Sequence, residues 1–200
     1  QYKKFFHLEG SDVEFTPGFH LLLGNNAQGK TNILEALYML STLRSFRGVA
    51  SAQMVRHGQN GFFVGGKTHH AGDHEIKIFW SPKERNLAID GRPVRRMSEF
   101  LGIFRSVVFC SEDIQLVKGP ASPPRRYVDL LLTQTRSTYL ALLQRYIRTV
   151  RSRNALLKHR VIDPSALVAF TQEMITTGEE LMTLRRKVLP EISTTACEAY

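Results

Sequence analysis

Cysteine is scarce in this sequence, and no apolar run approaches membrane-spanning length. The only two cysteines among the 200 residues, Cys110 and Cys197, are far apart and belong to no metal-ligand pattern. We therefore expect reduced thiols in a cytoplasmic protein, and neither a disulfide framework nor a zinc site. A bilayer-spanning helix needs about 20 apolar residues, and no such run occurs. The chain opens on Gln1 without a signal-peptide pattern, so we expect no membrane partner.

Acidic residues are missing between Leu130 and Ile162, although the chain has 18 of them against 27 lysines and arginines. Seven basic residues lie in this stretch: Arg136, Arg145, Arg148, Arg151, Arg153, Lys158 and Arg160. An ordinary solvated helix face mixes both signs of charge. The stretch therefore predicts a polyanionic partner, nucleic acid first, with a solvated face or a protein partner as alternatives. Few aromatic residues accompany the arginines, which favours a duplex backbone over stacking on single-stranded bases.

One short stretch carries the clearest chemistry. Residues 24–31 read Gly-Asn-Asn-Ala-Gln-Gly-Lys-Thr, the G-x-x-x-x-G-K-T pattern of a phosphate-binding P-loop. The apolar run at residues 19–23 predicts a buried strand before it, and residues 32–40 have apolar side chains at helical spacing. This context of strand, loop and helix disfavours a chance match.

The residue types of the P-loop fit ATP and Mg²⁺. Gly24 and Gly29 permit backbone angles that turn successive N–H groups toward an anion. With the positive end of the following helix, these groups would bind the α- and β-phosphates. Lys30 would reach the β- and γ-phosphates, and the Thr31 hydroxyl would bind Mg²⁺. The predicted nucleotide contacts are Gly24, Asn25, Asn26, Ala27, Gln28, Gly29, Lys30, Thr31 and Asn32.

The remaining residues before position 118 predict mostly strands. Residues 3–23 predict strands of a mixed sheet, and the P-loop helix should end near Leu43. Turn formers separate three further strands, at residues 62–64, 75–80 and 87–89, into an antiparallel meander. Residues 105–110 predict another buried strand.

Three histidines, His69, His70 and His74, lie near one turn of the meander. No cysteine or carboxylate spacing accompanies them, so we interpret them as solvated residues rather than metal ligands.

Two segments keep alternative interpretations. Arg44 and Arg47 follow the P-loop helix and either contact a phosphate or DNA, or complement the helix C-terminus. An acidic pair follows the apolar residues 105–110. We prefer a helix start there to a Walker B segment, because Ser111 offsets the acidic pair.

The second half of the chain predicts long helices. Two prolines at residues 123–124 open the first, since proline is favoured in the first helical turn. Apolar residues recur at helical spacing between residues 139 and 157, with the arginines projecting away from that stripe. Another helix should follow Pro164 and stop at Pro190. The last two helices together would form an antiparallel arm.

Five motifs occur in a fixed order along the chain. They are Phe15-Thr16-Pro17-Gly18, GNNAQGKTNILEAL from Gly24, Arg44-Ser45-Phe46-Arg47, VVFCSEDIQLVKG from Val107, and PPRRYVDLLL from Pro123. This set resembles the RecF family, the recombination mediators and replication-gap repair ATPases of bacteria. The resemblance covers most of the chain, and the ordered set is far more specific than a P-loop alone.

The resemblance implies an α/β fold, a P-loop NTPase of the ABC-ATPase head type with a mixed sheet, an antiparallel meander and a helical lobe. Residues 1–118 would form the P-loop ATPase lobe, and residues 119–200 a helical lobe with a helix-hairpin arm. Neither a signature motif nor a convincing Walker B segment occurs by Tyr200. Because both lie further along in the family, we expect the chain to correspond to the N-terminal part of a longer protein.

The resemblance also implies an ATP-dependent DNA-binding protein of recombinational repair, replication-gap processing and the SOS response. ATP would promote a homodimer that binds double-stranded DNA and junctions of single and double strands. RecR- and RecO-type mediators would be its partners in loading the recombinase. The full-length dimer would be a weak, DNA-stimulated ATPase, whereas the present residues alone would be nearly inactive.

The family's site residues map onto this sequence as follows. Gln115 is the candidate for holding Mg²⁺ and the attacking water, and Lys30 is the other catalytic candidate. The charge pattern of residues 130–162, rather than the resemblance, predicts the DNA contacts Arg145, Arg148, Arg151 and Arg153. Ala27 stands where related heads often have glycine, which the loop tolerates if Ala27 keeps φ below zero. Two rival functions are a nucleotide-gated structural DNA clamp with negligible turnover, and a small-molecule P-loop kinase.

Overall fold

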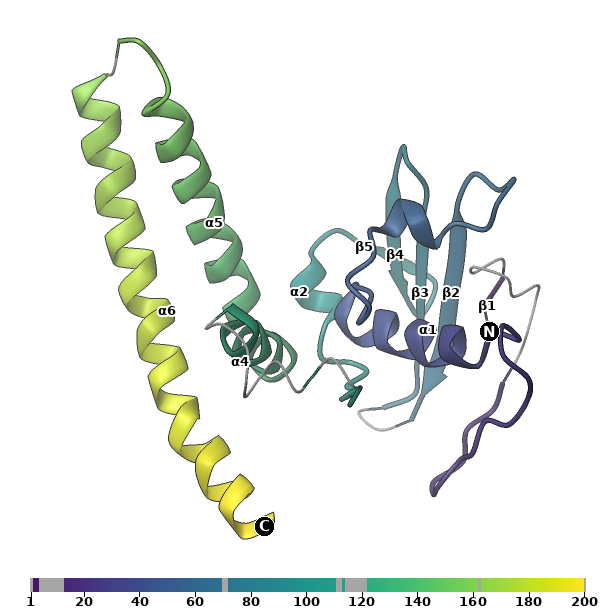
Figure 1. Cartoon of the computed structure of the whole chain (residues 1–200). Coiled ribbons are helices and arrows are strands. Elements are labelled where there is room, and N and C mark those ends of the chain that lie inside the picture. The colour runs from purple at the N-terminus through teal and green to yellow at the C-terminus, as the bar shows by residue number, and fades with distance from the viewer. Residues whose placement is uncertain are drawn as a thin grey trace. The chain divides into compact units, whose positions relative to one another are not determined.

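The computed structural model describes residues 2–3, 13–69, 72–110, 113, 122–161 and 163–199. The chain divides into two compact units, Gln1–Ile114 and Gln115–Tyr200. The first, here called the head unit, holds β1 (Tyr2–Lys3), α1 (Lys30–Thr42), the 3-10 helix η1 (Ser51–Met54), β2 (Phe62–Thr68), β3 (His74–Trp80), β4 (Arg85–Ile89), β5 (Arg92–Val94) and α2 (Met97–Phe100). The second, the helical unit, holds α4 (Ser122–Thr135), α5 (Tyr139–Leu156) and α6 (Pro164–Ala199). Figure 1 labels these elements.

The sheet of the head unit is an antiparallel meander in the order β1-β2-β3-β4-β5. The predicted meander is therefore confirmed, and β2 and β3 pair in register from Phe62↔Trp80 to Thr68↔His74. Asp90 and Gly91, with φ of 50° and 76°, form the tight turn between β4 and β5. Two positive φ values are typical of the hairpin turns that match strand twist, which explains the Asp-Gly pair.

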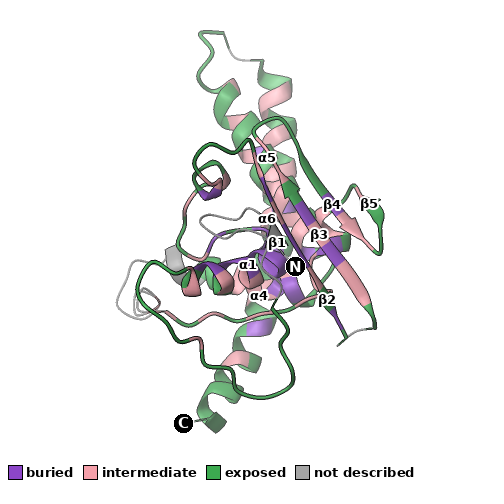
Figure 2. Cartoon of the chain, turned by 90° about the vertical axis from the view of Figure 1, so that its right-hand side faces the viewer, coloured by how far each residue is buried: buried purple, intermediate pink, exposed green. Residues whose placement is uncertain are grey.

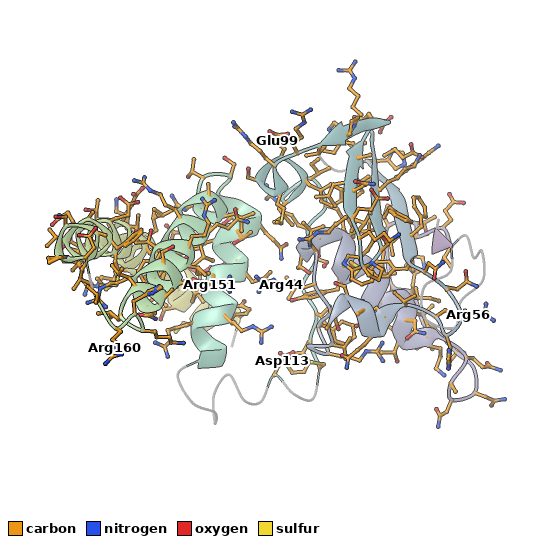
Figure 3. The ribbon with its side chains drawn as sticks, turned by 90° about the horizontal axis from the view of Figure 1, so that it is seen from above. Arg44, Arg56, Glu99, Asp113, Arg151 and Arg160 are labelled. Atoms are coloured by element: carbon orange, nitrogen blue, oxygen red, sulfur yellow. The ribbon has the colours of Figure 1, made fainter. Side chains whose placement is uncertain are left out.

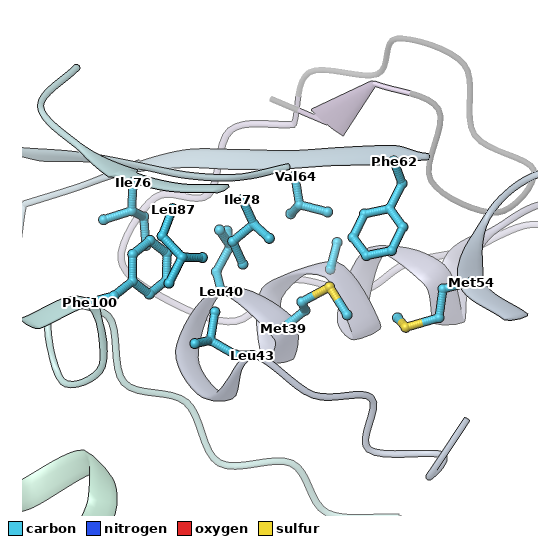
Figure 4. Packing of buried hydrophobic residues seen from close by; sticks show 11 residues of the cluster. Met39, Leu40, Leu43, Met54, Phe62, Val64, Ile76, Ile78, Leu87 and Phe100 are labelled. Carbon is cyan, nitrogen blue, oxygen red and sulfur yellow. The ribbon is translucent and has the colours of Figure 1, made fainter. Parts of the chain in front are cut away.

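The core of the head unit lies between α1 and one face of the sheet (Figure 4). Side chains alternate between the two faces of a strand, so Phe62 and Val64 of β2 point inward together. They pack with Met39 and Leu40 of α1, and Phe100 of α2 belongs to the same cluster. Figure 2 shows the buried positions gathered on α1 and the strands. The predicted end of the P-loop helix is also confirmed, because α1 ends at Thr42 with Leu43 as its cap.

Two strand predictions are wrong. Residues 13–23 and 105–110 have no regular secondary structure, and Phe19 and Phe109 are 88% and 93% exposed. A strand forms only beside a neighbour that accepts and donates its backbone hydrogen bonds. Among the described residues, no strand runs beside either segment. The described sheet is therefore purely antiparallel rather than mixed.

The helical unit follows its sequence pattern closely. α4 begins at Ser122 with both prolines in its first turn, and α5 covers the predicted apolar stripe. Leu132, Tyr139, Leu181 and Val188 form its buried core. Figure 1 shows α5 and α6 side by side and joined by a loop, the predicted hairpin arm. In the described part of the chain, no helix combines the length and apolar character that a bilayer crossing requires.

The predicted helix stop at Pro190 is wrong, because α6 continues through it to Ala199. Proline lacks the N–H that would bond to the carbonyl four residues earlier, so α6 misses one hydrogen bond at this point. The last buried side chain of the helix, Val188, lies just before the proline.

A polar cluster ties the three helices of this unit together. Arg185 of α6 donates from Nε to Asp129 Oδ1 at 2.8 Å and from Nη2 to Asp129 Oδ2 at 3.0 Å. The hydroxyl of Tyr139 donates to the same carboxylate. Burial, followed by the bond to Asp129, raises the pKa of Tyr139 well above its ordinary value. The hydroxyl therefore stays protonated, and remains a donor, across the neutral pH range.

Candidate functional site

The P-loop lies at the N-terminus of α1, where its glycines adopt the backbone angles that the motif requires. Gly24 has φ of 148° and Gly29 has φ of 90°. Gly29 is the N-cap of α1, no side chain caps this end, and no acidic residue lies in the first turn. The first N–H groups of a helix have no intrahelical acceptor. The loop and helix end therefore form an anion site with the polarity that phosphate needs.

Lys30 folds back over this loop. Its ammonium group donates to the carbonyl oxygens of Gly24 and Asn25, both at 2.7 Å. The only cation within residues 24–32 is thus held at the loop rather than extended into solvent. Thr31 follows on the exposed side of α1. The donors present fit a nucleotide phosphate, and the Thr31 hydroxyl is of the type that binds Mg²⁺ beside it.

Ala27 departs from its expected conformation. Its φ is +64°, so the expectation that it would keep φ below zero is wrong. The Gln28 side chain turns back within the same loop and accepts the Asn25 N–H at 3.1 Å. A left-handed conformation costs a non-glycine residue about 1–2 kcal/mol, because its Cβ crowds the following carbonyl. The loop therefore stores strain at the position where related heads often have glycine.

Replacing Ala27 with glycine should raise the free energy of unfolding of the head unit by about 1 kcal/mol, because it removes that crowding. Urea denaturation followed by circular dichroism measures the change. Ala50 offers a matched control, since it is exposed and has φ of −70°. Ala50→Gly should lower stability slightly, and equal losses in both variants would show that Ala27 is unstrained.

Asn32 contributes to the site differently from the other predicted contacts. Its side chain is buried, and Oδ1 accepts a hydrogen bond from Arg47 Nη2 at 3.2 Å. The side chain therefore faces the interior of the head unit, which leaves the backbone N–H for a ligand.

Sequence reasoning missed Glu35, which is fully buried in the middle of α1. Its carboxylate accepts hydrogen bonds from Ser45 Oγ and from the Arg47 guanidinium. A lone acid between apolar residues of the segment ILEAL was the available signal, since buried carboxylates need partners. Arg47 thus has a role that neither earlier alternative foresaw, as the partner of a buried carboxylate.

The loop after α1 is fixed by several independent contacts. Leu43 has φ of 57° and donates its N–H to Met39 O at 2.8 Å while its side chain enters the core. Phe46 packs edge-on against Tyr38, with ring centroids 5.8 Å apart. Ser45 and Arg47 are bound to Glu35. This loop therefore forms one rigid unit with α1 and presents the exposed side chain of Arg44.

The predicted DNA contacts separate into two pairs. Arg145 binds Glu173 of α6, with Nη2 2.9 Å from Oε2, and Arg153 Nε donates to Thr171 Oγ1 at 3.0 Å. Arg148 and Arg151 are exposed, and Figure 3 labels Arg151 on α5. The acids missing from α5 are thus supplied in part by α6. A role in DNA binding stays a prediction for all four.

Gln115 and the predicted acidic pair fall largely outside the described residues. Gln115 and Glu112 are not described. Asp113 is, and its carboxylate accepts the Cys110 N–H at 2.7 Å in a tight local turn. The choice between a helix start and a Walker B segment stays open.

The histidines near the meander turn have carboxylate partners that the sequence spacing did not suggest. His69 Nδ1 lies 2.7 Å from Asp73 Oδ1, and His74 Nδ1 lies 2.8 Å from Asp90 Oδ2. The hydrogen bond from the Glu75 N–H lowers the pKa of the Asp90 carboxyl, and the hydrogen bond from His74 adds a smaller effect in the same direction. Among the described side chains, no group of three or more metal-ligating residues gathers.

Comparison with known proteins places this geometry in context. No protein-family model matches the chain. A curated relative from Symbiobacterium thermophilum, called DNA replication and repair protein RecF, is 35% identical over 191 residues, which are 94% of this chain and 51% of the relative. A protein of the same name from Lacticaseibacillus casei is 33% identical over 196 residues, 96% of this chain and 53% of its own length. The chain is homologous to RecF proteins. It spans about half the length of the RecF relatives it matches.

Solved RecF structures agree with this relation. The recombination mediator protein RecF with ATP, described within the RecFOR pathway, matches with a TM-score of 0.89 and 30% identity over 94% of this chain and 52% of that structure. Its complex described as RecF-ATPrS matches with a TM-score of 0.88 at 29% identity, covering 94% of this chain and 53% of that one. The predicted resemblance to RecF and the predicted α/β ATPase-head fold are both confirmed.

Proposed function

We propose that the chain is the nucleotide-binding part of an ATP-dependent DNA-binding protein of replication and repair. The observation that carries the proposal is the P-loop, with Lys30 held across two of its carbonyl groups at the uncapped end of α1. The RecF relatives are called DNA replication and repair proteins, and one solved RecF structure is described with ATP.

The site would act by position and charge. Backbone N–H groups of residues 24–32 would hold the α- and β-phosphates, with the Gln28 side chain releasing the Asn25 N–H. Lys30 would move from Gly24 and Asn25 to the γ-phosphate side. A bound Mg²⁺, held by Thr31, would neutralise charge on the β- and γ-phosphates. Phosphoryl transfer to water needs no covalent intermediate with the protein.

The wider activity extends this proposal to the whole protein. ATP would drive a homodimer that binds duplex DNA and junctions of single and double strands, in the cytoplasm. Mediators of the RecR and RecO type are the proposed partners, since the solved relatives are described within the RecFOR pathway. The full-length dimer would hydrolyse ATP slowly, with stimulation by DNA.

ATP turnover by the full-length protein, with and without duplex DNA, tests this function. DNA-stimulated hydrolysis supports an ATPase. If ATP binds and dimers form but no turnover is measured with or without duplex DNA, the protein is a nucleotide-gated structural clamp rather than an ATPase.

Removing Arg148 and Arg151 should reduce the salt dependence of duplex binding. Each phosphate contact contributes about 0.9 to the magnitude of the slope of log affinity against log salt concentration. The slope of the double alanine variant should therefore be smaller in magnitude by up to about 1.8. Fluorescence anisotropy at several salt concentrations measures the slope. The comparison variant is Arg145→Ala with Arg153→Ala, which should reduce the slope less because both side chains are engaged by α6. An unchanged slope in the first variant would remove Arg148 and Arg151 from the DNA interface.

A further inference from the structure

The outward face of the sheet in the head unit carries two phenylalanines at adjacent positions. Phe63 of β2 pairs with Phe79 of β3, whereas their neighbours Phe62 and Trp80 stack together on the core side, with ring centroids 5.7 Å apart. Phe79 is 37% exposed. Successive side chains of a strand point to opposite faces of the sheet, so Phe63 and Phe79 do not pack into the core as Phe62 does. Phe63 is half-buried, so the two rings present adjacent, partly exposed aromatic surface on this face.

Gly65 determines how Phe63 lies on this face. A Cβ at Gly65 would come within 3.1 Å of Phe63 Cζ and 3.2 Å of Lys77 Cγ. The Phe63 ring therefore extends along the strand over the glycine, and the Lys77 stem approaches from the neighbouring strand. The missing side chain at position 65 lets an aromatic ring lie along the sheet instead of standing upright from it.

A hollow of about 730 Å³, open to solvent, adjoins the two rings. It is formed where β2 begins and β3 ends, and its lining is Gly58, Gln59, Asn60, Gly61, Phe62, Phe63, Phe79, Ser81, Pro82 and Lys83. Binding sites for small ligands fall in this size range and combine apolar walls with a few polar groups. Here the walls are aromatic, and the polar groups are two side-chain amides, a hydroxyl and an ammonium.

That combination matches an unpaired nucleobase. Aromatic rings stack on any base and contribute strongly to single-strand binding. Asparagine and glutamine amides donate and accept hydrogen bonds at base edges. Lys83 supplies a cation for the adjoining phosphate, and Arg56 and His57 lie just before the Gly58 side of the hollow. The basic residues favour a polyanion over an apolar peptide.

We infer that this hollow binds an unpaired base of single-stranded DNA, stacked against Phe63 and Phe79. The inference rests on the proposed DNA-binding function, but on a different surface from α5 and on none of the P-loop residues. The duplex backbone and the unpaired base would thus be read by separate units of the chain.

The test uses a short thymidine oligonucleotide with one central 2-aminopurine, whose fluorescence falls when it stacks. Titration of the protein at low salt should quench this fluorescence. Phe79→Leu should weaken binding about tenfold and reduce the quench strongly, because leucine keeps the apolar volume but cannot stack and only Phe63 then remains. Phe79→Tyr should restore both. Tyr127→Leu is the control, since Tyr127 is a 41% exposed aromatic of the helical unit.

Thermal melts establish that each variant is folded. The inference is overturned if wild-type protein gives no quench, if Phe79→Leu and Tyr127→Leu bind alike, or if an aromatic peptide binds the hollow and the oligonucleotide does not. Failure of the proposed function would look different. Wild-type protein would then bind neither ATP nor duplex DNA, while Phe79→Leu would still bind the oligonucleotide more weakly than the wild type does.

Discussion

Lys30→Ala should weaken ATP binding by about 100-fold and leave the fold intact. Removing one partner of a close charge pair costs about 2–5 kcal/mol, and each 1.4 kcal/mol is a factor of ten in affinity. The fold should tolerate the change, because the ammonium bonds only to carbonyl groups of an exposed loop. Titration with a fluorescent ATP analogue measures the affinity, and a thermal melt measures the fold.

The control for this variant is Lys67→Ala, which removes an exposed lysine from β2. Its ATP affinity should stay within about twofold of the wild-type value, since surface charges away from a site have little effect on affinity at physiological salt. In the full-length protein, Lys30→Ala should also abolish ATP-dependent dimerisation. Wild-type affinity in Lys30→Ala would contradict the assignment of the P-loop lysine to the phosphates.

Glu35→Ala should lower the free energy of unfolding of the head unit by about 3 kcal/mol. The carboxylate is fully buried and bound by Ser45 and Arg47, and breaking a buried ion pair leaves an uncompensated partner. Because the Arg47 side chain is 38% exposed, water offsets part of that loss. Glu35→Gln should cost less, since an amide oxygen still accepts a hydrogen bond from Ser45.

Urea denaturation of single and double variants isolates this pair. Glu35→Ala with Arg47→Ala should be less destabilised than the sum of the two single changes, because the residues share one interaction. Glu75→Ala is the matched control, since its carboxylate pairs with Lys77 on the exposed sheet face at 2.6 Å. Such surface pairs contribute about 1 kcal/mol or less. Strict additivity for Glu35 and Arg47 would mean that the pair does not stabilise the loop after α1.

Local patterns in the sequence were sufficient to predict the P-loop and several helices and strands. The glycine spacing of residues 24–31 predicted the positive φ of Gly24 and Gly29, and helical periodicity predicted α1 and α5. Turn formers between the strands predicted the antiparallel meander of β2, β3 and β4. Each of these signals depends on residues within one or two turns of chain, so no tertiary information was required.

Features that depend on distant residues were missed. An apolar run such as residues 19–23 predicts a buried strand only if a neighbouring strand is present, and sequence periodicity does not supply one. The Glu35–Arg47 pair requires the left-handed Leu43 that turns the chain back along α1. The Arg145–Glu173 pair spans 28 residues and exists only because α5 and α6 lie side by side.

The proline inside α6 gives the helical unit a mechanical property. At a rise of 1.5 Å per residue, the helix extends about 39 Å from Pro164 to Pro190. Helices bend most readily where a rung of the hydrogen-bond ladder is absent. A tilt of only about 5° at Pro190 would swing the far tip through roughly 3 Å over that length, the span of a hydrogen bond. Because Arg185 and Val188 hold α6 to the other two helices before Pro190, the hairpin and α4 would tilt together against the last turns of α6.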